Sequence, residues 1–201
     1  HSRRLDLRHH RHHHPREDQH ERHPLVPPRL LLEHHDREPG TPWFCVAGHS
    51  RPHSPFTAPG RYIRRYRDAV APPRTPTDGC LHPFAHNIGI GESGQAISAQ
   101  QTQRAREAYY ACVDFVDDCI GELLDGLDAH GLLDNTIIFL WSDHGEGLPR
   151  GKRWPYDRGI RIPLIVRWPD GLEPGSVTDQ LVSLVDLGPT VLSLCNVERP
   201  V

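Results

Sequence analysis

Hydrophobic positions along the chain follow two different spacings, one typical of helices and one of buried strands. From Ala108 to Leu127 apolar side chains recur every three or four residues, which predicts a long helix with one buried face. Ser98–Gln101 has the form of a capping box at its start, and Gly131 is expected to end it at the C′ position. Shorter helices are predicted over residues 60–66 and from Asp186 to Leu194.

Short apolar runs predict the strands. Residues 136–141 carry no charge, as expected for a strand covered on both faces, and residues 43–47 and 180–184 predict two further short strands. Residues 160–168 predict another, in which Pro163 favours an edge or a bulge. Because strands alternate with helices, we expect an α/β fold with a mixed, largely parallel sheet flanked by helices.

The first 40 residues differ in composition from the rest. Histidine, arginine, proline and acidic residues dominate residues 1–40, so we expect a disordered arm there and an α/β domain over residues 41–201. Two alternatives remain open from the sequence. The histidine clusters could bind transition metals, as histidine-rich tracts do, or the stretch could be a frame-shifted translation.

Composition limits the classes of function. The chain has 201 residues, 36% of them hydrophobic, which is enough for one domain with a core. A net charge of −3 argues against a nucleic-acid or membrane-surface partner. No apolar run approaches the roughly eighteen residues of a membrane span. The first residue is His1 and methionine is absent, so we expect a piece of a longer reading frame that lacks its amino-terminal part.

Cysteine usage gives no metal site. The five cysteines show no zinc spacing, and Cys112 and Cys119, seven residues apart on one helical face, are expected to pack as small hydrophobes. The acidic residues of the same helix are expected to be solvated or to make structural bonds.

The candidate chemistry begins where the strand predicted over residues 136–141 ends. Asp143, His144 and Gly145 follow it, at the sheet edge where α/β proteins bind ligands. Aspartate and histidine together can offer an oxygen and a nitrogen to a metal, and the glycine allows close backbone approach. An ordinary strand-to-loop turn is the alternative.

Two neighbouring segments add to this motif. Residues 148–169 follow the turn and begin Leu148-Pro149-Arg150-Gly151-Lys152-Arg153. Residues 43–56, which contain Arg51-Pro52-His53, lie far upstream. In this order and spacing the segments resemble the sulfatases of the alkaline phosphatase superfamily, and most of all the branch of heparan N-sulfatase-like enzymes. The resemblance covers roughly residues 42 to 200. It implies metal-dependent hydrolysis of sulfate from a sulfated carbohydrate or aryl ester.

The resemblance also assigns roles to particular residues. Asp143 and His144 match metal ligands of the family, and Lys152 matches the lysine that contacts the sulfate and the leaving-group oxygen. His53 matches a histidine that contacts sulfate and acts as the acid. Calcium is the metal expected for the family, although the imidazole of His144 suits manganese or zinc better.

Two family features are missing from the sequence. There is no Cys- or Ser-x-Pro-x-Arg, the pentapeptide whose first residue becomes the formylglycine nucleophile, and Ser50–Ser54 is only the nearest approach. The paired aspartates that supply the other metal ligands are also absent. We therefore expect this chain to lack turnover. The alternatives are a phosphomonoester or phosphonate hydrolase of the same superfamily, or a non-catalytic remnant that binds anions or metal.

Overall fold

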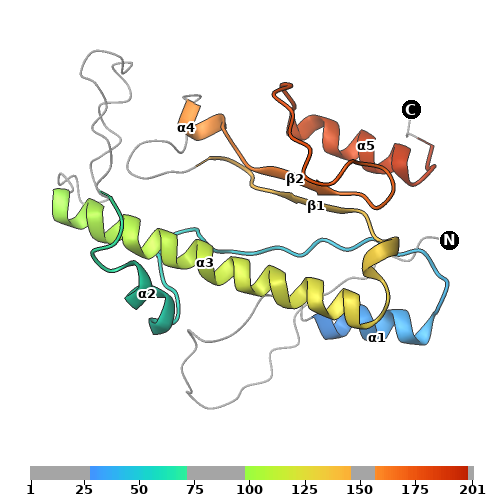
Figure 1. Ribbon diagram of the computed structural model, residues 1–201, viewed down its shortest axis with the longest axis horizontal. Helices are drawn as coiled ribbons and strands as arrows, with labels where there is room; N and C mark the ends of the chain where they lie inside the picture. The colour runs from blue at the N-terminus through green and yellow to red at the C-terminus, as the bar shows by residue number, and fades with distance from the viewer. Residues whose placement is uncertain (1–27, 72–97, 146–156, 199–201) are drawn as a thin grey trace.

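The computed structural model describes residues 28–71, 98–145 and 157–198, and its elements are arranged around one long helix (Figure 1). Two single-turn 3-10 helices accompany them, at Leu133–Asn135 and Leu184–Asp186. In chain order the helices and strands are α1 (Pro28–Arg37), α2 (Gly60–Tyr66), α3 (Ala99–Ala129), β1 (Ile138–Trp141), α4 (Asp157–Ile160), β2 (Leu164–Arg167) and α5 (Leu187–Leu194).

The signals that bound α3 act as predicted. Ser98 accepts a hydrogen bond from the Gln101 backbone, and the Gln101 side chain accepts one from the Ser98 backbone, which completes the capping box. At the other end Gly131 adopts a φ of 67°, and the amides of Gly131 and Leu132 bond back to carbonyls of the last helical turn. This is a Schellman ending, in which glycine avoids the steric cost of the left-handed conformation.

The described sheet consists of two antiparallel strands. β1 and β2 pair from Ile138 opposite Arg167 to Trp141 opposite Leu164. The largely parallel sheet predicted from the sequence is therefore not what this part of the chain shows. β1 is also shorter than predicted and only half-buried, with Trp141 42% exposed. Pro163 directly precedes β2, where a missing amide costs least.

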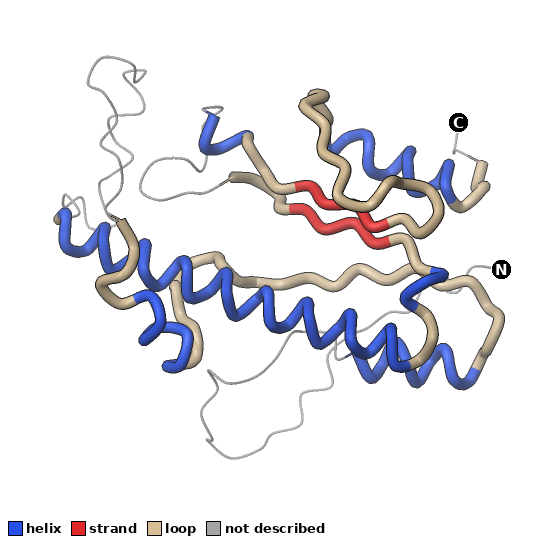
Figure 2. The backbone as a smooth tube through the Cα atoms, viewed as in Figure 1, coloured by secondary structure: helices blue, strands red, loops and turns tan. Residues whose placement is uncertain are grey.

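Two strand predictions are wrong. Residues 43–47 are extended but belong to no sheet in the described structure, and Phe44 is 74% exposed. They form part of the segment that runs between α3 and the β1–β2 pair (Figures 1 and 2). Residues 180–184 likewise form no strand, and Leu181 is fully exposed. Both runs have apolar residues, but a strand also needs a neighbouring backbone, and no described segment provides one.

The described core joins α2 to α3. Tyr62 is 1% exposed and packs with Ala111, Phe115 and Cys119. The predicted helix at residues 60–66 is confirmed. Cys112 and Cys119 are free and buried, as expected of small hydrophobes.

Two of the acidic residues on α3 make structural bonds. Asp114 pairs with Arg65 at 2.5 Å, and Asp118 accepts a hydrogen bond from the Tyr62 hydroxyl, also at 2.5 Å. Both carboxylates therefore help to fasten α2 to α3.

The segment predicted as a disordered arm contains a helix at its end. α1 lies against α3, and Leu32 is buried there. The difference from the prediction arises because the apolar residues at 30–32 fall on one helical turn. Their burial favours a packed helix although the neighbouring residues are charged. Residues 1–27 lie outside the described residues, and the boundary at residue 40 stays a prediction. None of the described helices combines the length and apolar character that crossing a bilayer requires.

Candidate functional site

The Asp143–His144 turn is held by its own hydrogen bonds. β1 ends at Trp141, and the Ser142 hydroxyl then donates to the His144 carbonyl at 2.6 Å. The His144 amide donates to Asp143 Oδ1 at 3.0 Å. These local bonds fix the backbone, so both side chains leave the strand end in defined directions.

The two side chains bring a carboxylate oxygen close to an imidazole nitrogen. His144 Nδ1 lies 2.9 Å from the Gly145 carbonyl, and because a carbonyl only accepts, Nδ1 carries the proton. In the neutral ring Nε2 is then a bare acceptor, 3.5 Å from Asp143 Oδ2. Two acceptors at this distance are close enough to share one cation. The side chains are 84% exposed for Asp143 and 37% for His144, so solvent ions reach them.

A backbone hydrogen bond ties this turn to α4. Gly145 is buried, and its amide donates to the Gly159 carbonyl at 2.8 Å. The backbone at Gly145 is thus held against α4. Lys152, the predicted sulfate contact, lies outside the described residues. Its role stays a prediction.

His53 lies on a loop that is held by hydrogen bonds to Thr57. The Arg51 guanidinium donates to the Thr57 carbonyl at 2.6 Å and to the Thr57 hydroxyl at 2.8 Å. The Cys112 thiol of α3 also donates to the Thr57 carbonyl, at 3.4 Å. His53 Nδ1 lies 2.6 Å from the Ser54 carbonyl, which leaves Nε2 of this exposed side chain for other partners.

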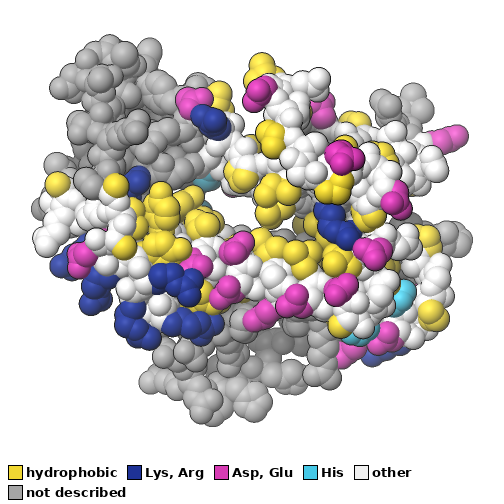
Figure 3. Space-filling model, viewed as in Figure 1, with side chains coloured by type: hydrophobic (Ala, Val, Ile, Leu, Met, Phe, Trp, Pro, Cys, Tyr) yellow, Lys and Arg dark blue, Asp and Glu magenta, His cyan; other side chains and the backbone are white. Residues whose placement is uncertain are grey.

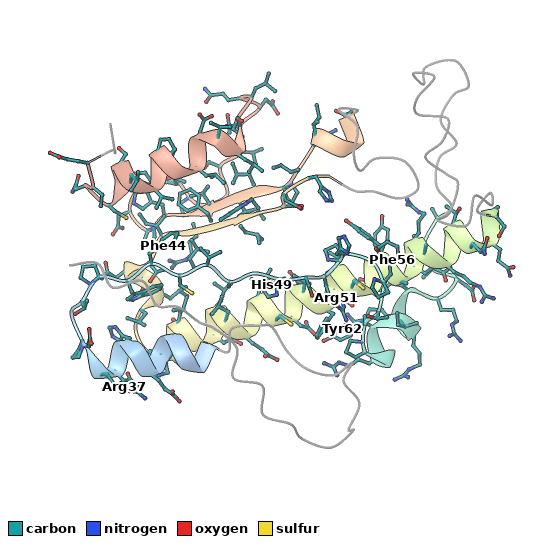
Figure 4. The ribbon with its side chains drawn as sticks, turned by 180° about the vertical axis from the view of Figure 1, so that it is seen from behind. Arg37, Phe44, His49, Arg51, Phe56 and Tyr62 are labelled. Atoms are coloured by element: carbon teal, nitrogen blue, oxygen red, sulfur yellow. The ribbon has the colours of Figure 1, made fainter. Side chains whose placement is uncertain are left out.

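Arg51 is the residue that sequence reasoning missed. The sequence alone assigns it no role, yet its two bonds to Thr57 close the loop over residues 51–57. Figure 4 shows it between His49 and Phe56 on the segment that runs along α3. The sequence signal for this contact was an arginine next to a proline, with a threonine six residues further on.

His49 is half-buried, and burial lowers the pKa of its imidazole, which favours the neutral ring at pH 7.

The described residues do not bring together a complete set of metal ligands. Within them, no group of three or more His, Cys, Asp or Glu side chains could hold a metal ion. No described hydrogen bond or ion pair joins His53 to the Asp143–His144 pair either. The described structure therefore shows two separately anchored segments, the Asp143–His144 turn and the loop that carries His53.

Comparison with known proteins decides the family. The Sulfatase family model matches residues 29–197. This chain belongs to the sulfatase family. The resemblance drawn from the three motifs is thereby confirmed, and with it the alkaline phosphatase superfamily.

Two curated relatives show how much of a sulfatase the chain represents. It is 31% identical to an arylsulfatase of Clostridium perfringens over 174 residues, which is 82% of this chain and 36% of the relative. It is 45% identical to a "Ulvan-active sulfatase" of Formosa agariphila over 91 residues, which is 45% of this chain and 15% of the relative. The chain thus spans about a third or less of these relatives. The curated sulfatases that it matches are sulfuric ester hydrolases.

A solved structure supports the fold. A phosphonate monoester hydrolase from Silicibacter pomeroyi superposes with a TM-score of 0.70 at 28% identity, covering 87% of this chain and 39% of the other. The sulfatase-like fold is confirmed at this level, while the parallel arrangement of its sheet is not seen in the described residues.

Proposed function

We propose that the chain forms part of a sulfatase active site that removes sulfate from a sulfated carbohydrate or an aryl ester. The observation that carries the proposal is the family match over residues 29–197, and the hydrogen-bonded Asp143–His144 turn at the carboxyl end of β1 supports it. The substrate class follows the names of similar proteins: an arylsulfatase, a ulvan-active sulfatase and the human N-acetylglucosamine-6-sulfatase, to which the chain is 31% identical over 76% of its length.

Asp143 and His144 are proposed as two ligands of a divalent cation. Their acceptor atoms face each other at 3.5 Å, and the bond from Nδ1 to the Gly145 carbonyl orients the ring as second-shell partners do in metal sites. Calcium is the proposed metal, although an imidazole nitrogen suits manganese or zinc better. A cation bound here would stabilise the charge that develops on the sulfuryl oxygens. Two donors make an incomplete site, so further ligands must come from outside the described residues.

Lys152 and His53 are proposed to act on the sulfate and the leaving group. The Lys152 ammonium would pair with the sulfate oxygens as a compact positive charge. Nε2 of a protonated His53 would donate its proton to the departing oxygen, because Nδ1 is already engaged with the Ser54 carbonyl. The sequence contains no formylglycine motif, so we propose that the 201-residue chain by itself does not turn over substrate.

Hydrolysis of phosphate or phosphonate esters is the second candidate. It is favoured by the likeness to the phosphonate monoester hydrolase, with a TM-score of 0.70 at 28% identity, and by the imidazole of His144 in the proposed ligand pair. Sulfuryl and phosphoryl groups present similar oxygens, so the proposed metal and Lys152 could bind the oxygens of either group.

The test measures binding and turnover separately. Titration calorimetry with Mn²⁺ and Ca²⁺ should detect a weak site in the wild-type chain that Asp143→Asn abolishes and the distant Asp170→Asn leaves unchanged. In the presence of metal, inorganic sulfate should bind more weakly to Lys152→Ala, and comparison with inorganic phosphate separates the two candidates. No release of nitrophenol from its sulfate or phosphate ester is expected. If Asp143→Asn left metal binding unchanged, the proposed metal site would be refuted. If the wild-type chain released nitrophenol, the proposal that it lacks turnover would be refuted.

A further inference from the structure

The outer face of α2 carries a cluster of arginines whose position follows from how the helix packs. Tyr62, Ile63 and Tyr66 face α3, with Tyr62 and Phe115 ring centroids 5.4 Å apart. The remaining positions must point outward. We call the four exposed arginines of this segment the α2 arginine patch: Arg61, Arg64, Arg65 and Arg67.

The acids nearby neutralise only part of this charge. Asp114 pairs with Arg65, and Asp118 is bonded to the Tyr62 hydroxyl. Arg64 and Arg67 have no carboxylate partner among the described residues. In Figure 3 the dark-blue side chains gather over α2, while acidic side chains follow the rest of α3. The chain has a net charge of −3, so this concentration of positive charge is local.

Aromatic rings hold part of the patch in place. The Arg61 guanidinium lies 4.6 Å from the centre of the Tyr62 ring and donates to its hydroxyl at 3.0 Å. Arg65 lies 5.9 Å from the same ring. Guanidinium groups held in this way lose less conformational freedom on binding an anion. Their planar forks match the oxygens of sulfate and phosphate groups, and the patch contains no lysine.

The patch is separate from the candidate site. α2 and the β1–β2 pair lie on opposite sides of α3 (Figures 1 and 4). A ligand that reaches both places must therefore be extended. At physiological ionic strength the screening length is about 8 Å, so arginines within two helical turns act together on a repeating anion.

We propose that the α2 arginine patch binds a sulfated polysaccharide chain, outside the site that carries Asp143 and His144. The choice of a sulfated ligand rests on the function proposed above, whereas the binding itself does not require turnover. The patch would hold a polymer on the chain while sulfate groups elsewhere along it reach the region of Asp143 and His144. Single sulfate esters would gain nothing from it.

The experiment compares polymers on the immobilised chain. Dextran sulfate, unsulfated dextran and a single-stranded RNA are passed over the wild type, over Arg64→Gln/Arg67→Gln, and over a control, Arg37→Gln/Arg161→Gln. The control removes the same charge from exposed positions on α1 and beside α4. Circular dichroism verifies that all variants keep the helical content of the wild type.

The wild type and the control should bind dextran sulfate equally, and unsulfated dextran should not bind. The patch variant should lose affinity on the order of tenfold, and the slope of log affinity against log salt should fall by about one to two. Equal losses in the patch variant and the control, or no binding of dextran sulfate by the wild type, would overturn the proposal. Tighter binding of RNA than of dextran sulfate would overturn the choice of ligand. Metal binding at Asp143 is measured in parallel, so failure of the patch is distinguishable from failure of the proposed site.

Discussion

Replacing Tyr62 tests whether the α2–α3 contact is the structural centre of the described chain. Tyr62→Phe removes only the hydroxyl that donates to Asp118 at 2.5 Å and accepts from Arg61 at 3.0 Å. A hydrogen bond to a charged group contributes about 1.5–3 kcal/mol when it is buried. Asp118 is exposed and regains water, so we expect a loss of about 1 kcal/mol.

Tyr62→Ala removes the ring as well. The side chain is 1% exposed and packs against Ala111, Phe115 and Cys119, so the substitution leaves a cavity. Truncations of buried aromatic residues cost about 3–5 kcal/mol, and we expect about 4 kcal/mol here. Tyr110→Phe is the matched control, because Tyr110 is 43% exposed and should change stability by less than about 0.5 kcal/mol.

Amide hydrogen exchange of α2, followed by mass spectrometry, measures these losses locally. Tyr62→Phe should raise the exchange rate about fivefold, and Tyr62→Ala about a thousandfold, since each 1.4 kcal/mol is a factor of about ten. If Tyr62→Ala exchanged no faster than the control, the reasoning that Tyr62 holds α2 on α3 would be refuted.

The pH dependence provides an independent check. Burial raises the pKa of the Tyr62 phenol, and the hydrogen bond to Asp118 raises it further. The unfolded chain therefore releases this proton first as pH rises. The contribution of Tyr62 is complete below about pH 10 and is lost as pH rises through the raised pKa. In urea unfolding followed by circular dichroism, the gap between wild type and Tyr62→Phe should shrink above about pH 10. A gap that widened there would contradict the sign.

Four further outcomes are expected. Gly131→Ala should destabilise the end of α3 by about 1–2 kcal/mol in urea unfolding, because the φ of Gly131 is 67°. Gly121→Ala should stabilise α3 by about 0.5–1 kcal/mol, because no atom lies within 4 Å of the added Cβ. If the two substitutions changed the free energy of unfolding in the same direction, the Schellman ending would be contradicted. His144→Ala should weaken Mn²⁺ binding in calorimetry more than Ca²⁺ binding, because manganese accepts imidazole more readily; equal losses would argue against nitrogen ligation. Lys152→Ala should weaken sulfate binding without changing metal affinity, and a loss of both would show that Lys152 supports the fold of the loop. The edge of β1 that no described strand pairs with should make the isolated chain prone to aggregation, and a monodisperse protein in light scattering would contradict this.

The parts of the fold that follow from local signals could be predicted from the sequence. The bounds of α3 depend on Ser98 and Gly131, each of which acts on its own helical turn. The same holds for α2, whose residues 60–66 were predicted directly. α1 was not predicted, because its single apolar turn lies among charged residues that are typical of a disordered segment.

Strands could not be predicted in the same way, because a strand depends on what lies beside it. Residues 43–47 and Ile138–Trp141 have similar apolar runs, yet within the described part of the chain only the second pairs with another strand, β2. The antiparallel direction of that pair is also a property of two distant segments. No local pattern in either run specifies it.

In the candidate site, too, local motifs could be predicted from the sequence and contacts between separated residues could not. Asp143, His144 and His53 could be proposed from the sequence because their motifs are contiguous, and the structure shows hydrogen bonds that hold the backbone at each of them. The function of Arg51 in closing the loop over residues 51–57 depends on Thr57, and it became visible only in three dimensions. Lys152 lies outside the described residues, so its place rests on the motif alone.

The two halves of the candidate site depend on the same helix. Near the middle of α3, Cys112 bonds to Thr57 and so fixes the loop that carries His53. At the other end, the segment after α3 is bonded to β2, because the Arg167 guanidinium donates to the Leu133 carbonyl and to the Asp134 carboxylate. The strand pair that carries the Asp143–His144 turn is thus fixed to the carboxyl end of the helix. Loosening α2 should therefore disturb the loop that carries His53 before it disturbs the Asp143–His144 turn. In Tyr62→Ala, exchange over residues 51–57 should rise while exchange at residues 142–145 stays unchanged, and an equal rise in both would mean that α3 couples the halves as one rigid unit.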